Sequence, residues 1–253
     1  MPTPSLDLNC DMGEQWPGRS DELDAAILPY VTSCNIACGF HSGHPAGIER
    51  TIRAAVAQGV AIGAHPSYND REHFGRRSLR VERALLLAEL RYQIAALKGM
   101  VESFGQRLQH VKPHGALYHD LLTDPALARD FVALIKAMDP GLRIVGLAHG
   151  ILEAACAEQG LRYVHEGFAD RRYESRDRLR ARRHPDAVLH EPGLILAQVE
   201  DFLQGQVRTL AGETCPIRVE TLCLHSDTEG AVALSRRIHE YLRERHVHLS
   251  APV

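Results

Sequence analysis

The chain has 253 residues, of which 45% are hydrophobic and 24% charged, and its formal net charge is -3. This balance is typical of a soluble globular protein and gives no electrostatic reason to expect nucleic-acid or membrane partners. The start lacks the basic and apolar segments of a signal peptide, and no apolar run is long enough to span a membrane. Six cysteines form no C-x-x-C pair, so we expect them to be reduced and mostly buried. These features predict a cytoplasmic protein.

Short apolar runs alternate with longer amphipathic segments along the chain. This alternation predicts strands joined by crossover helices, and therefore a mostly parallel sheet. No linker or change of composition divides the chain, so we predict one domain over residues 1–253. The clearest expected helices are 46–59, 81–105 and 229–246, and the clearest expected strands are 60–65, 108–115, 142–148, 161–168 and 219–227.

Titratable side chains stand at the ends of several expected strands. They are Asp11, His65, Lys112, His114, His225 and Asp227. Such groups at the carboxyl ends of different strands are typical of the active site of a (β/α) barrel. The turn after the first expected strand is not a G-x-G-x-x-G loop, which argues against an open dinucleotide-binding sheet. We therefore predict an α/β fold, a single (β/α) barrel of about seven parallel strands.

The first expected strand, SLDLNCDMGE (5–14), alternates apolar residues with Asp7, Asn9 and Asp11. Carboxylates crowded inside a barrel repel one another and need a cation, a proton or hydrogen-bond donors. Such a set can bind a cation, orient a water or contact a substrate. Glu14 follows the strand, and capping of the next turn explains it equally well. For the set as a whole we expect a functional role.

Histidines follow the next two expected strands. His41 lies in a loop flanked by glycines and His65 directly precedes a proline, so we expect both to face the site. A lone histidine is more often a satisfied core residue, but the strand-end positions favour function. Pro45 suits the first position of a helix, which makes His44 the expected cap.

Lys112 is one of only three lysines and stands at a strand end. Because burying an unpaired ammonium costs about 5 kcal/mol, it needs an anionic partner, either the acidic cluster or an anionic group of a substrate. Arg76, Arg77 and the arginines of FADRRY (168–173) either decorate solvated loops or reach an anionic substrate. Asp227 is explained by helix capping as well as by catalysis, whereas His225 has no such structural role.

Seven motifs occur in the order and spacing of the LamB/YcsF family, which the chain resembles from about Leu6 to past Leu234. They are DLNCDMGE, NIACGFHSG, GVAIGAHPSY, FGRR, HVKPHGALY, EGFADRRY and LHSDTEGAVAL. Two positions depart from the family pattern: His44 stands where Asp is common, and Ser226 where Gly is common. The first change removes a carboxylate near the expected site and puts a metal or capping role there in doubt.

The resemblance implies a seven-stranded barrel similar to those of glycoside hydrolases and polysaccharide deacetylases. It also implies the role of the A subunit in a bacterial 5-oxoprolinase, which works with two further subunits, B and C. The implied reaction opens 5-oxo-L-proline to L-glutamate while ATP is converted to ADP and phosphate. ATP would be a co-substrate, although the chain contains no G-x-x-x-x-G-K-[ST] loop.

For this reaction we expect Asp11, with His65, His114 or His225, to position and deprotonate a water, and Lys112 or an arginine to hold an anionic group. The expected substrate-binding residues are Asn9, Asn35, Arg76, Arg171 and Asp227. If a divalent metal binds, the first candidate ligands are Asp7, Asp11, His41 and His65, a set that suits Zn²⁺, Mn²⁺ or Fe²⁺ better than Ca²⁺. Two alternatives stay open: a stand-alone metal-dependent deacetylase or amidohydrolase that needs no ATP, and a non-catalytic, substrate-carrying subunit.

Overall fold

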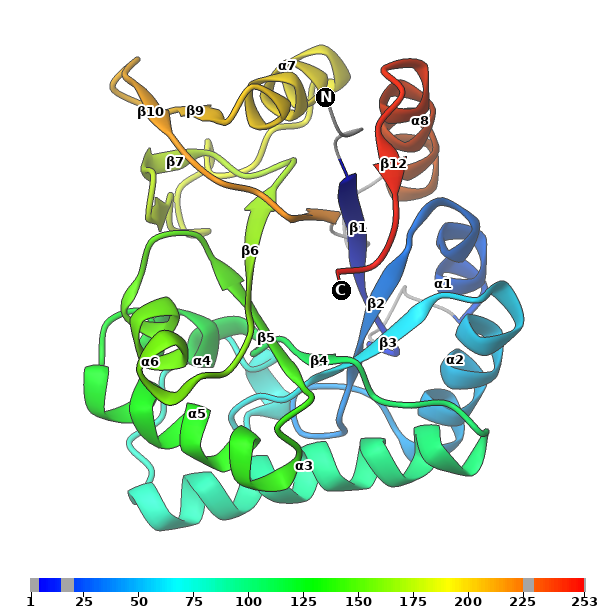
Figure 1. The fold of residues 1–253 in the computed structure, drawn as a ribbon, viewed down its shortest axis with the longest axis vertical. Helices are drawn as coiled ribbons and strands as arrows, with labels where there is room; N and C mark the ends of the chain where they lie inside the picture. Colours follow the sequence, from blue (N-terminus) through cyan, green and yellow to red (C-terminus); the bar gives the residue numbers. More distant parts are fainter. Residues whose placement is uncertain (1–4, 15–20, 225–229, 253) are drawn as a thin grey trace.

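The computed structural model describes residues 5–14, 21–224 and 230–252. In this part of the chain, seven parallel strands close into a barrel, because β11 pairs with both β6 and β1 (Figure 1). The predicted α/β barrel of about seven strands is therefore confirmed. In barrel order the strands are β1 (Ser5–Met12), β2 (Ser33–Ala37), β3 (Ala61–His65), β4 (His110–Val111), β5 (Arg143–Leu147), β6 (Tyr163–Phe168) and β11 (Thr221–Leu224).

Helices surround the ring of strands (Figure 1). As predicted, His44 caps α2, where its ring accepts a hydrogen bond from the Gly47 amide. Among the described helices, none is both long enough and apolar enough to cross a membrane. The helices are α1 (Asp21–Ile27), α2 (Pro45–Gln58), α3 (Arg83–Ser103), α4 (Gly115–Asp120), α5 (Pro125–Met138), α6 (Ile151–Gln159), α7 (Pro192–Leu203) and α8 (Ala231–Glu244), with short 3₁₀ turns at Leu28–Tyr30 and Arg71–His73.

Two small hairpins interrupt the alternation between β6 and β11. β7 (Tyr173–Ser175) pairs with β8 (Arg178–Leu179), and β9 (Gln206–Arg208) pairs with β10 (Thr214–Pro216). A last strand, β12 (His248–Leu249), pairs with the beginning of β1. The sequence did not predict the β7–β8 hairpin, because its strands are too short and too rich in arginine to show an apolar period.

The alternation in β1 separates two environments. Leu6, Leu8 and Cys10 belong to the apolar core, whereas Asp7 and Asn9 make polar contacts with residues of other barrel strands. A one-residue slip of this strand would move its polar groups into the apolar layer, so the pattern fixes the register. All six cysteines are free thiols and five of them are buried, as expected.

Candidate active site

The polar side chains inside the barrel form successive layers, and Asp7 belongs to the layer nearest the amino ends of the strands. Its carboxylate accepts hydrogen bonds from the hydroxyls of Thr32, Ser33 and Thr221. Burial raises the pKa of Asp7 to about 6, although these three donors oppose the shift. We predicted Asp7 as a metal ligand, but hydroxyl groups occupy its oxygens well below the carboxyl ends of the strands. Asp7 therefore lies in the barrel interior, apart from the cluster of possible metal ligands described below.

The next layer is a network of amides around His110. Asn35 Nδ2 donates to Asn9 Oδ1 and to Asp11 Oδ1, both at 2.8 Å, and His110 Nε2 lies 2.7 Å from Asn35 Oδ1. Burial, followed by the charge of Lys112, lowers the pKa of His110 to about 3, so the ring is a neutral donor. Asn9 and Asn35 are 1% and 0% exposed. Both were predicted to bind substrate; in the structure their side chains are buried below the cavity and bond Asp11 and Lys112.

Lys112 has the anionic partners that its burial requires. Its ammonium lies 3.0 Å from Asp11 Oδ1 and 2.7 Å from Glu166 Oε1. Burial alone would lower the pKa of Lys112, but the charges of Asp11 and Glu166 raise it above its usual value. Lys112 therefore stays protonated at neutral pH, and its positive charge favours the ionised form of Asp11.

Four buried side chains converge at the carboxyl ends of β1, β2, β3 and β4. They are Glu14, His41, His65 and His114, whose potential ligand atoms all lie within 4.8 Å of one another. The rings of His41 and His114 are stacked, with centroids 3.7 Å apart. Gly13, with φ of 68°, turns the chain after β1 and so directs Glu14 back toward the histidines.

Hydrogen bonds on the outer side of the cluster fix the tautomer of each ring. His65 Nδ1 lies 2.7 Å from the Lys112 carbonyl, and His114 Nε2 lies 2.8 Å from the Phe74 carbonyl. Because a carbonyl only accepts, both of these nitrogens carry the proton. His41 Nδ1 lies 3.0 Å from the Ser67 hydroxyl, whose own proton goes to the Tyr68 carbonyl. The inner nitrogens of neutral His41 and His114 therefore direct lone pairs at Glu14, whereas His65 Nε2 lies 3.0 Å from His114 Nδ1 and donates to it when His65 is protonated.

The four donors fit a first-row metal ion. Three nitrogens and one carboxylate oxygen around Zn²⁺, each at about 2.1 Å, would lie about 3.4 Å from one another in a tetrahedron. Glu14 Oε1 lies 3.1 Å from His41 Nε2, 3.4 Å from His114 Nδ1 and 3.8 Å from His65 Nε2. The outer hydrogen bonds resemble those that orient metal-binding histidines generally. This set shares His41 and His65 with the ligands that we predicted. It contains Glu14 and His114 where we expected Asp7 and Asp11.

The three histidines of the cluster differ in how readily they bind a proton. Burial lowers the pKa of His41 and of His114, so both rings are neutral and able to ligate. Burial would also lower the pKa of His65, but Asp11 and Glu14 raise it. His65 Nε2 lies 3.3 Å from Asp11 Oδ2. A metal cation bound among these groups would balance the charges of Asp11 and Glu14, which otherwise favour a proton on His65.

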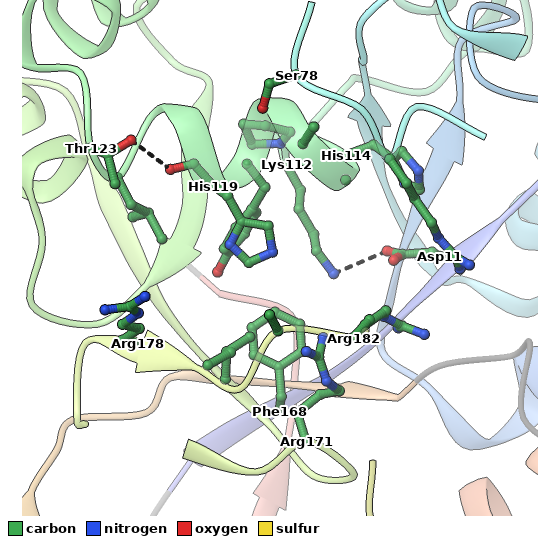
Figure 2. Close-up of a pocket in the computed structure, with 18 of the residues that line it drawn as sticks. Asp11, Ser78, Lys112, His114, His119, Thr123, Phe168, Arg171, Arg178 and Arg182 are labelled. Carbon is green, nitrogen blue, oxygen red and sulfur yellow. Dashed lines mark hydrogen bonds and ion pairs between the residues drawn. The ribbon is translucent and has the colours of Figure 1, made fainter. Parts of the chain in front are cut away.

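A cavity of about 1000 Å³ opens above this cluster. Figure 2 shows Lys112 and His119 extending into it from one side and Arg171, Arg178 and Arg182 on the other. Among our predicted site residues, Asp11, His65, Lys112, His114, Arg76 and Arg171 line this cavity. His225, Ser226 and Asp227 lie outside the described residues.

The sequence analysis left Glu14 between a capping and a functional role, and it missed Glu166. Glu14 falls after Gly13, where the period of the strand no longer predicts direction. Glu166 lies within the run LRYVHEGF, where a single acid is easily assigned to the solvent face. The unpaired charge of Lys112 was the signal that could have pointed to Glu166.

His44, the first departure from the family pattern, does not belong to the cluster. It is an exposed helix cap, and its ring bonds the Gly47 amide at 3.2 Å. The substitution therefore leaves all four converging donors in place.

Comparison with protein families supports the motif assignment. Residues 6–253 match the model of the LamB/YcsF family. The chain belongs to the LamB/YcsF family. The match covers almost the full sequence, as the distribution of the seven motifs predicted.

Relatives of this LamB/YcsF chain carry consistent names. It is 45% identical over 234 residues to the 5-oxoprolinase A subunit of Paracidovorax citrulli, covering 92% of this chain and 93% of that protein. It is 43% identical to the 5-oxoprolinase A subunit of Methylococcus capsulatus, covering 98% and 95%. A crystal structure of a lactam utilization protein from Thermus thermophilus superposes with a TM-score of 0.91 at 37% identity, covering 98% of this chain and 100% of that one.

Proposed function

We propose that this chain is the A subunit of an ATP-dependent 5-oxoprolinase, which hydrolyses the cyclic amide of 5-oxo-L-proline to L-glutamate. The observation that carries the proposal is the position of Asp11, which lines the cavity beside the cluster of Glu14 and three histidines. The names of the relatives supply the substrate class. The B and C subunits are the proposed partners, in the cytoplasm, and ATP is the proposed co-substrate.

Asp11 is the proposed base. Asn35 and Lys112 bond its Oδ1, whereas Oδ2 lies toward His65 at the cavity. In the proposed step, Asp11 takes a proton from a water that attacks the ring carbonyl. The same carboxyl returns this proton to the ring nitrogen as the C–N bond breaks. General base catalysis of this kind contributes about 10²- to 10⁴-fold.

Glu14, His41, His65 and His114 would hold a divalent metal ion. Such an ion polarises a carbonyl and lowers the pKa of a bound water. The chain itself orients the ligands through the Ser67 hydroxyl and the carbonyls of Lys112 and Phe74. This support keeps the inner ring nitrogens directed at the site before any ion binds.

The substrate carboxylate needs a cationic partner, but Lys112 already forms ion pairs with Asp11 and Glu166. The predicted substrate-binding arginines, Arg76 and Arg171, both line the cavity, where they can meet anionic groups of a ligand. ATP coupling provides the activation that an unreactive amide requires. Transfer of the terminal phosphoryl group of ATP to the exocyclic carbonyl oxygen makes the carbonyl carbon a better electrophile and leaves ADP. Attack by water and cleavage of the C–N bond then give γ-glutamyl phosphate, and a second water releases phosphate and L-glutamate.

A stand-alone metal-dependent amidohydrolase is the second candidate, favoured by the same cluster of one glutamate and three histidines. The deciding experiment measures glutamate release from 5-oxoproline by the chain alone and by the complex with its co-purified partners, each with and without ATP. The proposal predicts release only by the complex with ATP. Release by the chain alone without ATP, abolished by a chelator, would establish the second candidate instead.

A further inference from the structure

Among the described residues, Arg171 is a buried arginine that forms no ion pair with an acidic side chain. It is 3% exposed and lines the cavity. Its Nε and Nη2 donate to the backbone carbonyls of Ala187 at 3.3 Å and Arg180 at 2.6 Å. The carbonyls satisfy donors but do not neutralise the guanidinium, and the nearby carboxylate of Asp170 favours its charge without forming an ion pair with it. A buried charge of this kind requires an anion.

Further cations surround Arg171 on the same wall of the cavity. Arg178, Arg182 and Arg183 also line it, and Figure 2 shows Arg171 and Arg182 side by side below Lys112. Burial and the charge of Arg182 lower the pKa of Arg171 to about 10, which leaves it charged at neutral pH. Arg178 pairs with Glu174, and Asp177 also lines the cavity, so the positive charge of this wall is concentrated at Arg171 and its neighbour Arg182.

The loop that carries Arg171 is held rigidly. The side-chain amide of Gln198, on α7, donates to the carbonyls of Phe168 at 2.7 Å, Ala169 at 3.0 Å and Arg171 at 2.9 Å. Gln198 is itself buried. A ligand that reaches the guanidinium thus meets a group that is already ordered, which lowers the entropic cost of binding.

We propose that Arg171 and Arg182 form a subsite for a phosphate group at this wall of the cavity. A phosphate dianion, with three acceptor oxygens, suits two adjacent guanidiniums better than a single carboxylate does. The Nε and Nη2 of Arg171 each already donate to a backbone carbonyl, so a ligand meets the remaining Nη protons, which can bind one phosphate oxygen while another oxygen faces Arg182. Arg76, which also lines the cavity, is then the candidate for the substrate carboxylate.

The inference rests on the proposed function, in which either ATP or a phosphorylated lactam brings the phosphate group. Isothermal titration of the purified chain at fixed ionic strength would use inorganic phosphate, acetyl phosphate and ATP as probes. We expect saturable phosphate binding that Arg171→Gln and Arg182→Gln each weaken at least about tenfold, as expected for loss of a charge-assisted hydrogen bond. Arg236→Gln removes an exposed arginine that is paired with Glu240, and should change binding less than about twofold.

The probes separate the two sources of phosphate. Tighter binding of ATP indicates a nucleotide subsite, and tighter binding of acetyl phosphate indicates an acyl-phosphate-like substrate. Because Arg182 is exposed, its substitution tests the subsite even if Arg171→Gln disturbs folding. Absence of saturable binding to the wild type, or equal binding by Arg182→Gln, would overturn the inference. If one of these two results were found while the complex still released glutamate, the phosphate subsite would be refuted and the proposed function would stand.

Discussion

The ammonium of Lys112 lies 2.7 Å from the carboxylate of Glu166 inside the barrel. Both groups are buried, with Glu166 0% exposed and Lys112 2% exposed. The same ammonium also contacts Asp11, which reaches the cavity. Glu166 thus neutralises a lysine that holds a second carboxylate at the cavity floor.

Replacement of Glu166 by Gln should destabilise the fold by about 3 kcal/mol, because the buried ammonium would keep only Asp11 as a charged partner. Denaturant unfolding of the two proteins measures the difference. Glu240→Gln is the matched control, since its ion pair with Arg236 is exposed and screened by solvent, so its loss should leave stability almost unchanged. Equal stability losses in the two variants would show that the Lys112–Glu166 pair is not what balances the interior charge.

Gly63 makes room for the ring of His110. A Cβ at this position would lie 2.1 Å from His110 Nε2, so Gly63→Ala should displace the ring and cost at least about 2 kcal/mol. Gly99→Ala, on the exposed side of α3 with open space around it, should stabilise the protein by about 0.5 to 1 kcal/mol. Thermal unfolding of both variants checks the pair. A neutral Gly63→Ala would contradict the packing of this layer.

Asp7 should make stability fall as pH rises. Its pKa is about 6 in the folded protein against an ordinary 3.8, so the folded state retains the proton longer than the unfolded state does. Its stabilising contribution is complete below pH 3.8 and is lost as pH rises toward 6, by about 3 kcal/mol in total. The difference in unfolding free energy between wild type and Asp7→Asn, followed from about pH 4 to about pH 7, isolates this effect. A difference that does not change with pH would refute it.

The metal site can be tested without turnover. His114→Ala and Glu14→Gln should each reduce Zn²⁺ or Mn²⁺ affinity at least about 100-fold, because each removes one of four converging ligands. Metal content after incubation and gel filtration, measured by mass spectrometry, gives the result. His44→Ala alters an exposed histidine outside the cluster and should retain full metal content. Equal loss in all three variants would argue against this ligand set.

The strand-end rule pointed to Asp11, Lys112 and His114, which the structure brings to one cavity, because strand period is a property of local sequence. The alternation of Asp7, Asn9 and Asp11 correctly indicated one polar face, but it carried no information on depth within the barrel. Depth depends on which strands pair and in what register, and Asp7 pairs with Thr221, 214 residues away. That long-range register separates Asp7 from the cavity that Asp11 lines.

Glu14 and Arg171 show a different limit. The direction of Glu14 depends on the left-handed turn at Gly13, and the burial of Arg171 depends on hydrogen bonds from Gln198 on α7. Neither relationship follows a helix or strand period. The sequence could indicate that these residues lie near strand ends, but it could not predict which side chains would meet.

The most direct test of the central claim is glutamate release by the reconstituted complex carrying Asp11→Asn in this chain. The account predicts a loss of about 10²- to 10⁴-fold in kcat, because the substitution removes the proposed base. Circular dichroism and co-purification with the partner subunits would verify folding and assembly, and Glu240→Gln should retain wild-type activity. A folded, assembled Asp11→Asn complex that releases glutamate at the wild-type rate would contradict the account.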